Sequence, residues 1–307
     1  MKEQLSKGIY FCIIIVAFAG ILNSPMALIL GFIYTLTLNN PFKAQSRKAI
    51  GYLLKISVVG LGFGMLISET LATSKEGFSL TVCSIVLTVS VGLLLTKLFK
   101  LDLKLGYLIT SGTAICGGSA IAAISPIIKA DSKTISIALG VVFLLNSIAL
   151  LTFPSIGHFL QLTQAQFGLW CAVAIHDTSS VVGAAIEYGE ESLRIATTVK
   201  LSRALWIIPL SIFSIFFFKV KGEKFKIPYF ILLFILAILI NSYAGLPESV
   251  TSAIVGGAKR LLIVTLFLVG TTISIEDLKS VGLRPIGFAL SLWVFISIFS
   301  LGYILYV

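Results

Sequence analysis

The strongest chemical signal in the sequence is a run of five polar residues, 176–180, between two apolar segments. Charged groups enclosed by apolar sequence are costly to bury and usually functional. Asp177 or Thr178 could also cap a following helix, and His176 could be a structural histidine. Capping and site function are compatible, and a buried Asp and His can titrate where a proton gradient uses them. We therefore predict ion coupling by His176 and Asp177, and substrate binding by Thr178, Ser179 and Ser180.

A second break, at 116–119, combines paired glycines with small polar residues. Paired glycines weaken a helix and let the backbone open. A half-helix that starts near Ser119 would present unpaired N–H groups and a positive dipole end, which suits an anion. The alternative is that these small residues only allow close helix packing. We predict that four residues here contact substrate: Cys116, Gly117, Gly118 and Ser119.

Two basic residues, Lys200 and Arg203, lie three positions apart, so they share one face of a predicted helix. Lys200 follows the start of its apolar segment at Ser192 by about 8 residues, roughly 12 Å along a helix. Snorkelling from that depth is difficult, so both charges should face the protein interior. They could clamp a substrate anion, or one could form a structural ion pair with Asp177.

The composition requires these groups to lie in a membrane protein. The chain has 307 residues, of which 57% are hydrophobic and 12% charged, about half the charge of a soluble domain. The net charge of +10 lies mostly between apolar runs, as in cytoplasmic loops near anionic lipid, so we expect no nucleic-acid partner. No cysteine or histidine spacing suggests a metal or disulfide frame, no GxxxxGK[ST] motif suggests ATP, and we expect no cofactor.

A full span needs about 20 apolar residues. Nine segments approach this length, at 8–22, 25–38, 49–68, 78–98, 132–154, 192–218, 228–245, 260–274 and 282–306. The predicted fold is all-α and integral to the membrane, with one transporter domain over 1–307 that includes an extra N-terminal span at about 8–22. The interrupted elements, at about 105–129 and 167–188, have halves of about 11 residues, or roughly 16 Å. Each is either one broken crossing or a re-entrant hairpin.

Charge distribution favours the re-entrant alternative. With the N-terminus inside, a re-entrant 105–129 keeps Lys129 and Lys133 inside, and Glu187, Glu190 and Glu191 fall outside. Val-Gly at 59–60 and Gly-Phe at 77–78 recur at 269–270 and 287–288, an offset of 270 − 60 = 210 residues. In the re-entrant count these spans have opposite orientations, which predicts inverted-topology repeats.

These segments resemble a family of proposed sulfate exporters of the bacterial inner membrane, over nearly the whole chain. The resemblance is carried by 114–120, by the His176 segment with 181–185, and by 199–203. It implies a relation to cation/proton antiporters and anion carriers with inverted repeats and interrupted helices. The chain departs from that family at Asp177, where many members have Glu, so its substrate could differ.

The leading hypothesis is a multi-pass inner-membrane secondary transporter that exports small anions such as sulfate or organic sulfonates, and is not an enzyme. The substrate would lie between two half-helix N-termini near the membrane midplane. One alternative is a cation/proton antiporter that uses Asp177. A minor alternative is a membrane-embedded serine hydrolase with Ser119 and His176. The expected partners are lipid and a small anion, and the sequence leaves assembly into a homo-oligomer open.

Overall fold

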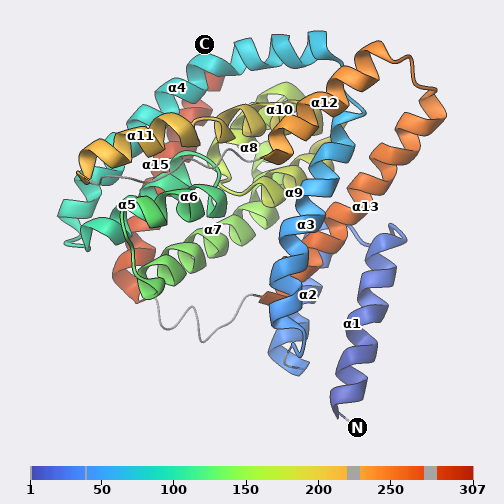
Figure 1. Ribbon diagram of the computed structural model, residues 1–307, viewed down its shortest axis with the longest axis horizontal. Helices are drawn as coiled ribbons and strands as arrows, with labels where there is room; N and C mark the ends of the chain where they lie inside the picture. Colours follow the sequence, from blue (N-terminus) through green and yellow to red (C-terminus); the bar gives the residue numbers. More distant parts are fainter. Residues whose placement is uncertain (1, 39, 220–228, 273–281, 307) are drawn as a thin grey trace.

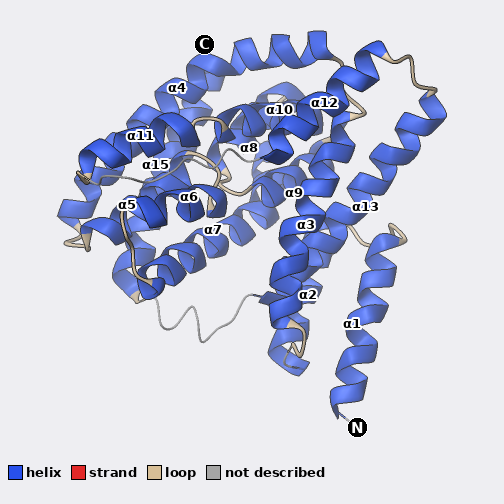
Figure 2. Cartoon of the chain, in the orientation of Figure 1, coloured by secondary structure: helices blue, strands red, loops and turns tan. Residues whose placement is uncertain are grey.

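The computed structural model describes residues 2–38, 40–219, 229–272 and 282–306, and these ranges are helical with no strand (Figure 2). The helices are α1 Lys2–Phe18, α2 Ser24–Leu38, α3 Lys43–Gly62, α4 Ile67–Leu98, α5 Leu103–Ala114, α6 Gly118–Ile127, α7 Ser132–Phe159, α8 Gln164–Ala174, α9 Thr178–Tyr188, α10 Glu190–Ala204, α11 Ile207–Phe217, α12 Tyr229–Tyr243, α13 Glu248–Thr272 and α15 Leu283–Tyr306.

The all-α membrane class is confirmed. In the described part of the chain, five helical segments are long and apolar enough to cross a membrane, and shorter apolar helices accompany them. Large apolar side chains are exposed along many of these helices, as expected where lipid is the solvent. Exposed examples from three helices are Ile15, Leu94 and Ile298.

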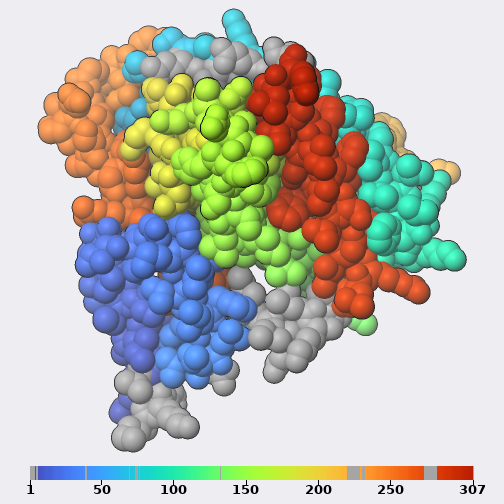
Figure 3. Space-filling model, turned by 180° about the vertical axis from the view of Figure 1, so that it is seen from behind, coloured from blue at the N-terminus to red at the C-terminus, as the bar shows by residue number. Residues whose placement is uncertain are grey.

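The helices form two groups (Figure 1). In the first group, α13 packs against α1, α2 and α3, and α12 packs on α3; in the second, α4 to α11 pack together with α15. From behind, α8 and α9 lie between α13 and α15 (Figure 3). Contacts of α9 with α2 and α13 join the groups. Two polar contacts also join them: Glu187 accepts from the Ser24 N–H at the start of α2 (3.0 Å), and Lys259 pairs with Glu190 (2.5 Å).

The first interrupted element folds as a helical hairpin. Its two half-helices are α5 and α6, which residues 115–117 separate. At the open end, the Nζ of Lys104, in the first turn of α5, donates to the carbonyl of Lys129, just after α6, at 2.9 Å. Because the start of α5 and the end of α6 meet, the chain returns to the side from which it entered.

The second interrupted element has the same form. The Tyr188 hydroxyl, at the end of α9, donates to the Leu162 carbonyl, just before α8, at 2.6 Å. The Glu191 N–H likewise donates to Oε1 of Gln164, the first residue of α8, at 3.1 Å. The two ends of this hairpin therefore also lie together, which favours a re-entrant hairpin over a single broken crossing for both elements.

Helix α7 sets the relative direction of the two hairpins. It has 28 residues, which span about 42 Å. It begins at Ser132, five residues after α6, and ends at Phe159, five residues before α8. The open ends of the hairpins therefore lie at opposite ends of α7, and the hairpins enter from opposite sides, as the prediction of inverted topology requires.

This arrangement makes a topological prediction that can be tested in intact cells. We expect Lys133→Cys and Glu191→Cys, both at exposed positions, to react with a membrane-impermeant maleimide from opposite faces of the membrane. The exposed native residues Cys12 and Cys83 would first be replaced by serine to remove background labelling. Labelling of both introduced cysteines from the same face would contradict the opposed hairpins.

Candidate functional site

The tips of the two hairpins meet beside the middle of α7. A Cβ added to Gly117 would lie 3.3 Å from the His176 carbonyl oxygen and 3.3 Å from a methyl carbon of Val142. Gly117 has φ +61° and ψ −118°, a conformation that side chains other than glycine rarely adopt. A glycine is therefore required at the first tip, both for its backbone conformation and for its approach to the second tip.

Asn146 on α7 holds the second tip. Its Oδ1 accepts a hydrogen bond from the His176 backbone N–H at 2.9 Å, and its side chain is buried. Val142 and Asn146 are four residues apart on one face of α7, so the same face contacts both tips. Sequence reasoning missed Asn146, although a buried amide near the centre of an apolar span is itself a signal of function or packing.

The N-terminus of α9 is capped by Asp177. The carboxylate accepts from the backbone N–H groups of Ser179 (3.1 Å) and Ser180 (3.4 Å), and from the Ser179 hydroxyl. The capping interpretation of Asp177 is therefore correct. Thr178, Ser179 and Ser180 are buried in the first turn of α9.

The N-terminus of α6 differs because no side chain caps it. Its N-cap is Gly117, which has no side chain to accept a hydrogen bond. Cys116 is buried at the tip, Gly118 is partly buried and the Ser119 side chain is exposed. The structure thus brings the four predicted residues of the first break to one tip, at a helix N-terminus that no side chain caps.

Lys200 and Arg203 are both fully buried, as predicted, but neither is held by Asp177. The Nζ of Lys200 donates to the carbonyls of Ala172 (3.2 Å) and Ile175 (2.7 Å), at the C-terminal end of α8. In Arg203, Nη2 donates to the Ala114 carbonyl (2.5 Å), the last residue of α5, and Nη1 to the Ser84 hydroxyl (2.6 Å).

One helix, α10, therefore supplies a cation to the C-terminus of each inward half-helix. A helix C-terminus carries roughly half a negative charge, which a nearby cation stabilises. The hydrogen bonds of the two cations point to carbonyl and hydroxyl oxygens. The proposed ion pair with Asp177 is therefore absent from the described contacts of both residues.

The charges at the tips do not cancel. The two C-termini contribute roughly −0.5 each and the two N-termini roughly +0.5 each, which sum to zero. Lys200 and Arg203 add two positive charges when protonated, and the ionised Asp177 adds one negative charge. With both basic side chains protonated, the tip region as a whole would carry an excess of about one positive charge within a low-dielectric interior.

Several buried polar atoms at the tips have no hydrogen-bond partner among the described residues. They are Nδ2 of Asn146, both ring nitrogens of His176, Nε of Arg203 and Oγ1 of Thr113. Buried polar groups are nearly always paired, so unpaired ones mark places where a water, an ion or a ligand could bind. No hydrogen bond joins His176 to Ser119, so the dyad that a serine hydrolase would use is not formed here.

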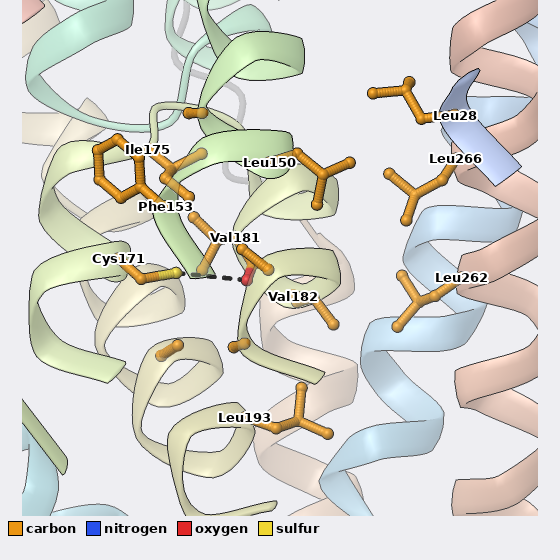
Figure 4. Packing of buried hydrophobic residues seen from close by; sticks show 14 of the residues in the cluster. Leu28, Leu150, Phe153, Cys171, Ile175, Val181, Val182, Leu193, Leu262 and Leu266 are labelled. Carbon is orange, nitrogen blue, oxygen red and sulfur yellow. Dashed lines mark hydrogen bonds between the residues drawn. The ribbon is translucent and has the colours of Figure 1, made fainter. Parts of the chain in front are cut away.

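Apolar packing supports the second hairpin from both sides (Figure 4). Val182 lies on the side of α9 that faces Leu262 and Leu266 of α13. On the other side, the Cys171 thiol of α8 donates to the Val181 carbonyl of α9 at 3.4 Å. The half-helices of this hairpin are therefore held to each other and to the neighbouring helix group.

The chain is similar to membrane proteins over almost its whole length. Residues 7–289 match a family model described as conserved hypothetical protein 698. A UPF0324 membrane protein of Bacteroides thetaiotaomicron is 50% identical, with 95% of this chain and 89% of the relative covered. One from Photobacterium profundum is 50% identical over 98% and 93%, and one from Porphyromonas gingivalis is 47% identical over 94% and 88%. No solved structure matches the chain.

Proposed function

The chain belongs to the conserved hypothetical protein 698 family, the UPF0324 membrane proteins, and we propose that this multi-pass membrane protein is a secondary transporter of small anions. The observation that carries the proposal is the pair of fully buried basic side chains, Lys200 and Arg203, where the two opposed hairpins meet. Buried charge of one sign is unfavourable unless a counter-charge accompanies it. A bound anion would supply that counter-charge.

The geometry also favours an oxyanion as the substrate. The uncapped N-terminus of α6 offers backbone N–H groups, and Ser119 adds a hydroxyl beside them. Oxyanions accept such donors at helix N-termini. Sulfate and organic sulfonates fit this donor set, and they agree with the resemblance of the three tip segments to proposed sulfate exporters. The residues Cys116, Gly117 and Gly118 lie at the same hairpin tip, directly before Ser119.

The roles of the other site residues follow from their contacts. Lys200 and Arg203 supply the positive field while they hold the ends of α8 and α5. Thr178, Ser179 and Ser180 form the first turn of α9 and are the residues proposed to bind substrate at that helix N-terminus. His176, with two unpartnered ring nitrogens, and Asp177, which caps α9, are the groups proposed for proton coupling. A change in protonation at either would change the charge excess and thus the affinity for the anion.

The proposal can be tested by the thermal stability of the purified protein in detergent. We expect sulfate or methanesulfonate to raise the melting temperature more than chloride at matched ionic strength. A ligand at 100 times its Kd stabilises the folded state by about 2.7 kcal/mol, which gives a shift of several degrees. Intrinsic tryptophan fluorescence would report the transition.

The same screen separates the alternatives. Stabilisation by sodium or lithium, with no response to any anion, would contradict the anion carrier and favour a cation/proton antiporter that uses Asp177. Covalent labelling of Ser119 by a fluorophosphonate, lost in His176→Ala, would instead indicate a serine hydrolase. For the carrier we expect neither result, since the Asp177 carboxylate is engaged in the cap and Ser119 has no bond to His176.

A further inference from the structure

Asn146 stands out among the residues that the sequence did not identify. It lies near the middle of α7, the helix that runs from the end of one hairpin to the start of the other. Its side chain is only 2% exposed, yet only one of its two polar atoms has a partner. The Oδ1 atom binds the His176 N–H, while Nδ2, with two N–H donors, binds nothing among the described residues.

An unpaired amide at this position requires an explanation. Leaving a buried donor unsatisfied costs about 1–3 kcal/mol. The Oδ1 contact alone does not account for the amide, because the NH₂ group adds nothing to it. The free donors therefore point to a further acceptor that is present when the protein works.

The neighbouring groups indicate the chemistry of that acceptor. The His176 ring shares the electrostatic environment of Lys200 and Arg203, and Nε–H of Arg203 is also unpartnered. Asn146 Nδ2 and Arg203 Nε offer only donors. A species with acceptor oxygens and negative charge suits such donors, whereas a metal cation would need acceptors that they lack.

We propose that Asn146 is a substrate-binding residue with two functions: Oδ1 fixes the second hairpin tip through His176, and Nδ2 donates to an oxygen of the bound oxyanion. This inference rests on the proposed anion transport. Under this proposal, the position of the second hairpin tip and the binding of the anion depend on each other, because the same planar amide group contacts both. An anion that binds Nδ2 orients the amide so that Oδ1 meets the His176 N–H.

The test uses two variants of the full-length protein with sulfate and methanesulfonate as probes. Asn146→Asp keeps an oxygen to accept from His176 but loses the NH₂ donors and adds charge. Asn146→Leu loses both functions without adding charge. We expect both to bind the probe that stabilises the wild type about tenfold to hundredfold more weakly, the usual effect of losing a donor to a charged group. Ser147→Ala, at the adjacent position whose hydroxyl binds the Phe143 carbonyl, should retain wild-type affinity.

Hydrogen exchange separates the two functions of the amide. The His176 amide should remain protected in Asn146→Asp and exchange faster in Asn146→Leu. Wild-type affinity in Asn146→Leu would overturn the substrate role and leave a structural amide that binds a buried water. If no anion stabilises the wild type, the proposed function itself fails, and a response to a cation in its place would refute the donor role of Asn146. If Asn146→Asp does not fold, Asn146→Ala replaces it, and we expect the probe to raise the melting temperature of that variant much less than that of the wild type.

Discussion

Arg203→Gln is expected to lower the free energy of unfolding by about 3 kcal/mol or more, since hydrogen bonds to a charged group are worth about 1.5–3 kcal/mol each. Arg203 donates to the Ala114 carbonyl and the Ser84 hydroxyl from a fully buried position. The shorter, neutral glutamine cannot reach both acceptors, and the C-terminus of α5 loses its compensating charge. Unfolding in SDS mixed micelles would measure the difference.

The matched control is Arg284→Gln, the same substitution at an exposed position of α15. It should change stability by less than about 0.5 kcal/mol, as is usual for surface substitutions. The double variant Arg203→Gln with Asp177→Asn distinguishes the helix cap from an ion pair. If Arg203 caps α5, removing Asp177 adds its own cost. Recovery of stability in the double variant would show that Asp177 and Arg203 are paired, against the contacts described here.

Gly270→Ala is expected to destabilise the protein by about 1–3 kcal/mol, the usual cost of overpacking. A Cβ at Gly270 would lie 2.3 Å from the Leu28 carbonyl oxygen and 3.0 Å from Cα of Gly31, where α13 crosses α2. These are backbone atoms, so no side-chain rotation relieves the clash and the helices must separate. A lower melting temperature would report the effect.

The control for this prediction is Gly257→Ala on the same helix. Outside its own helix backbone and chain neighbours, no atom of the described residues lies within 4 Å of a Cβ at Gly257. The change should therefore be neutral or stabilise by up to about 1 kcal/mol through helix propensity. The two alanines are thus expected to act with opposite sign. Equal effects would mean that the crossing at Gly270 is not as close as described.

The opposed hairpins explain why the buried polar and charged groups lie at one depth in the protein. Each hairpin has half-helices that end within the protein, so four helix termini converge. Non-helical backbone at membrane depth is tolerated only where protein or a wet cavity surrounds it. Three of the four termini have a side-chain partner: Lys200 at the end of α8, Arg203 at the end of α5 and Asp177 at the start of α9. Asn146 in addition accepts from the backbone N–H of His176 at the second tip. The N-terminus of α6 has no side-chain cap.

The sequence alone determined the solvent, the class and the position of the breaks. An apolar chain with few charges must be a membrane protein, because it cannot cover a surface in water. The glycine pair at 117–118 and the polar run at 176–180 end their half-helices for local reasons, namely backbone freedom and side-chain capping. The cap by Asp177 could be predicted because its partners are two and three residues away.

The tertiary structure alone decided which groups meet. Whether each interrupted element crosses or returns depends on contacts such as Lys104 with Lys129, at 25 residues' separation. The partners of Arg203 are 119 and 89 residues away, and Asn146 lies 30 residues from His176. Composition and periodicity show that such groups are buried. Composition and periodicity do not specify which group each buried side chain binds, because several elements can offer a carbonyl or an N–H at the same depth. Only the packing of α7 and α10 against both hairpins determines the hydrogen-bond partner.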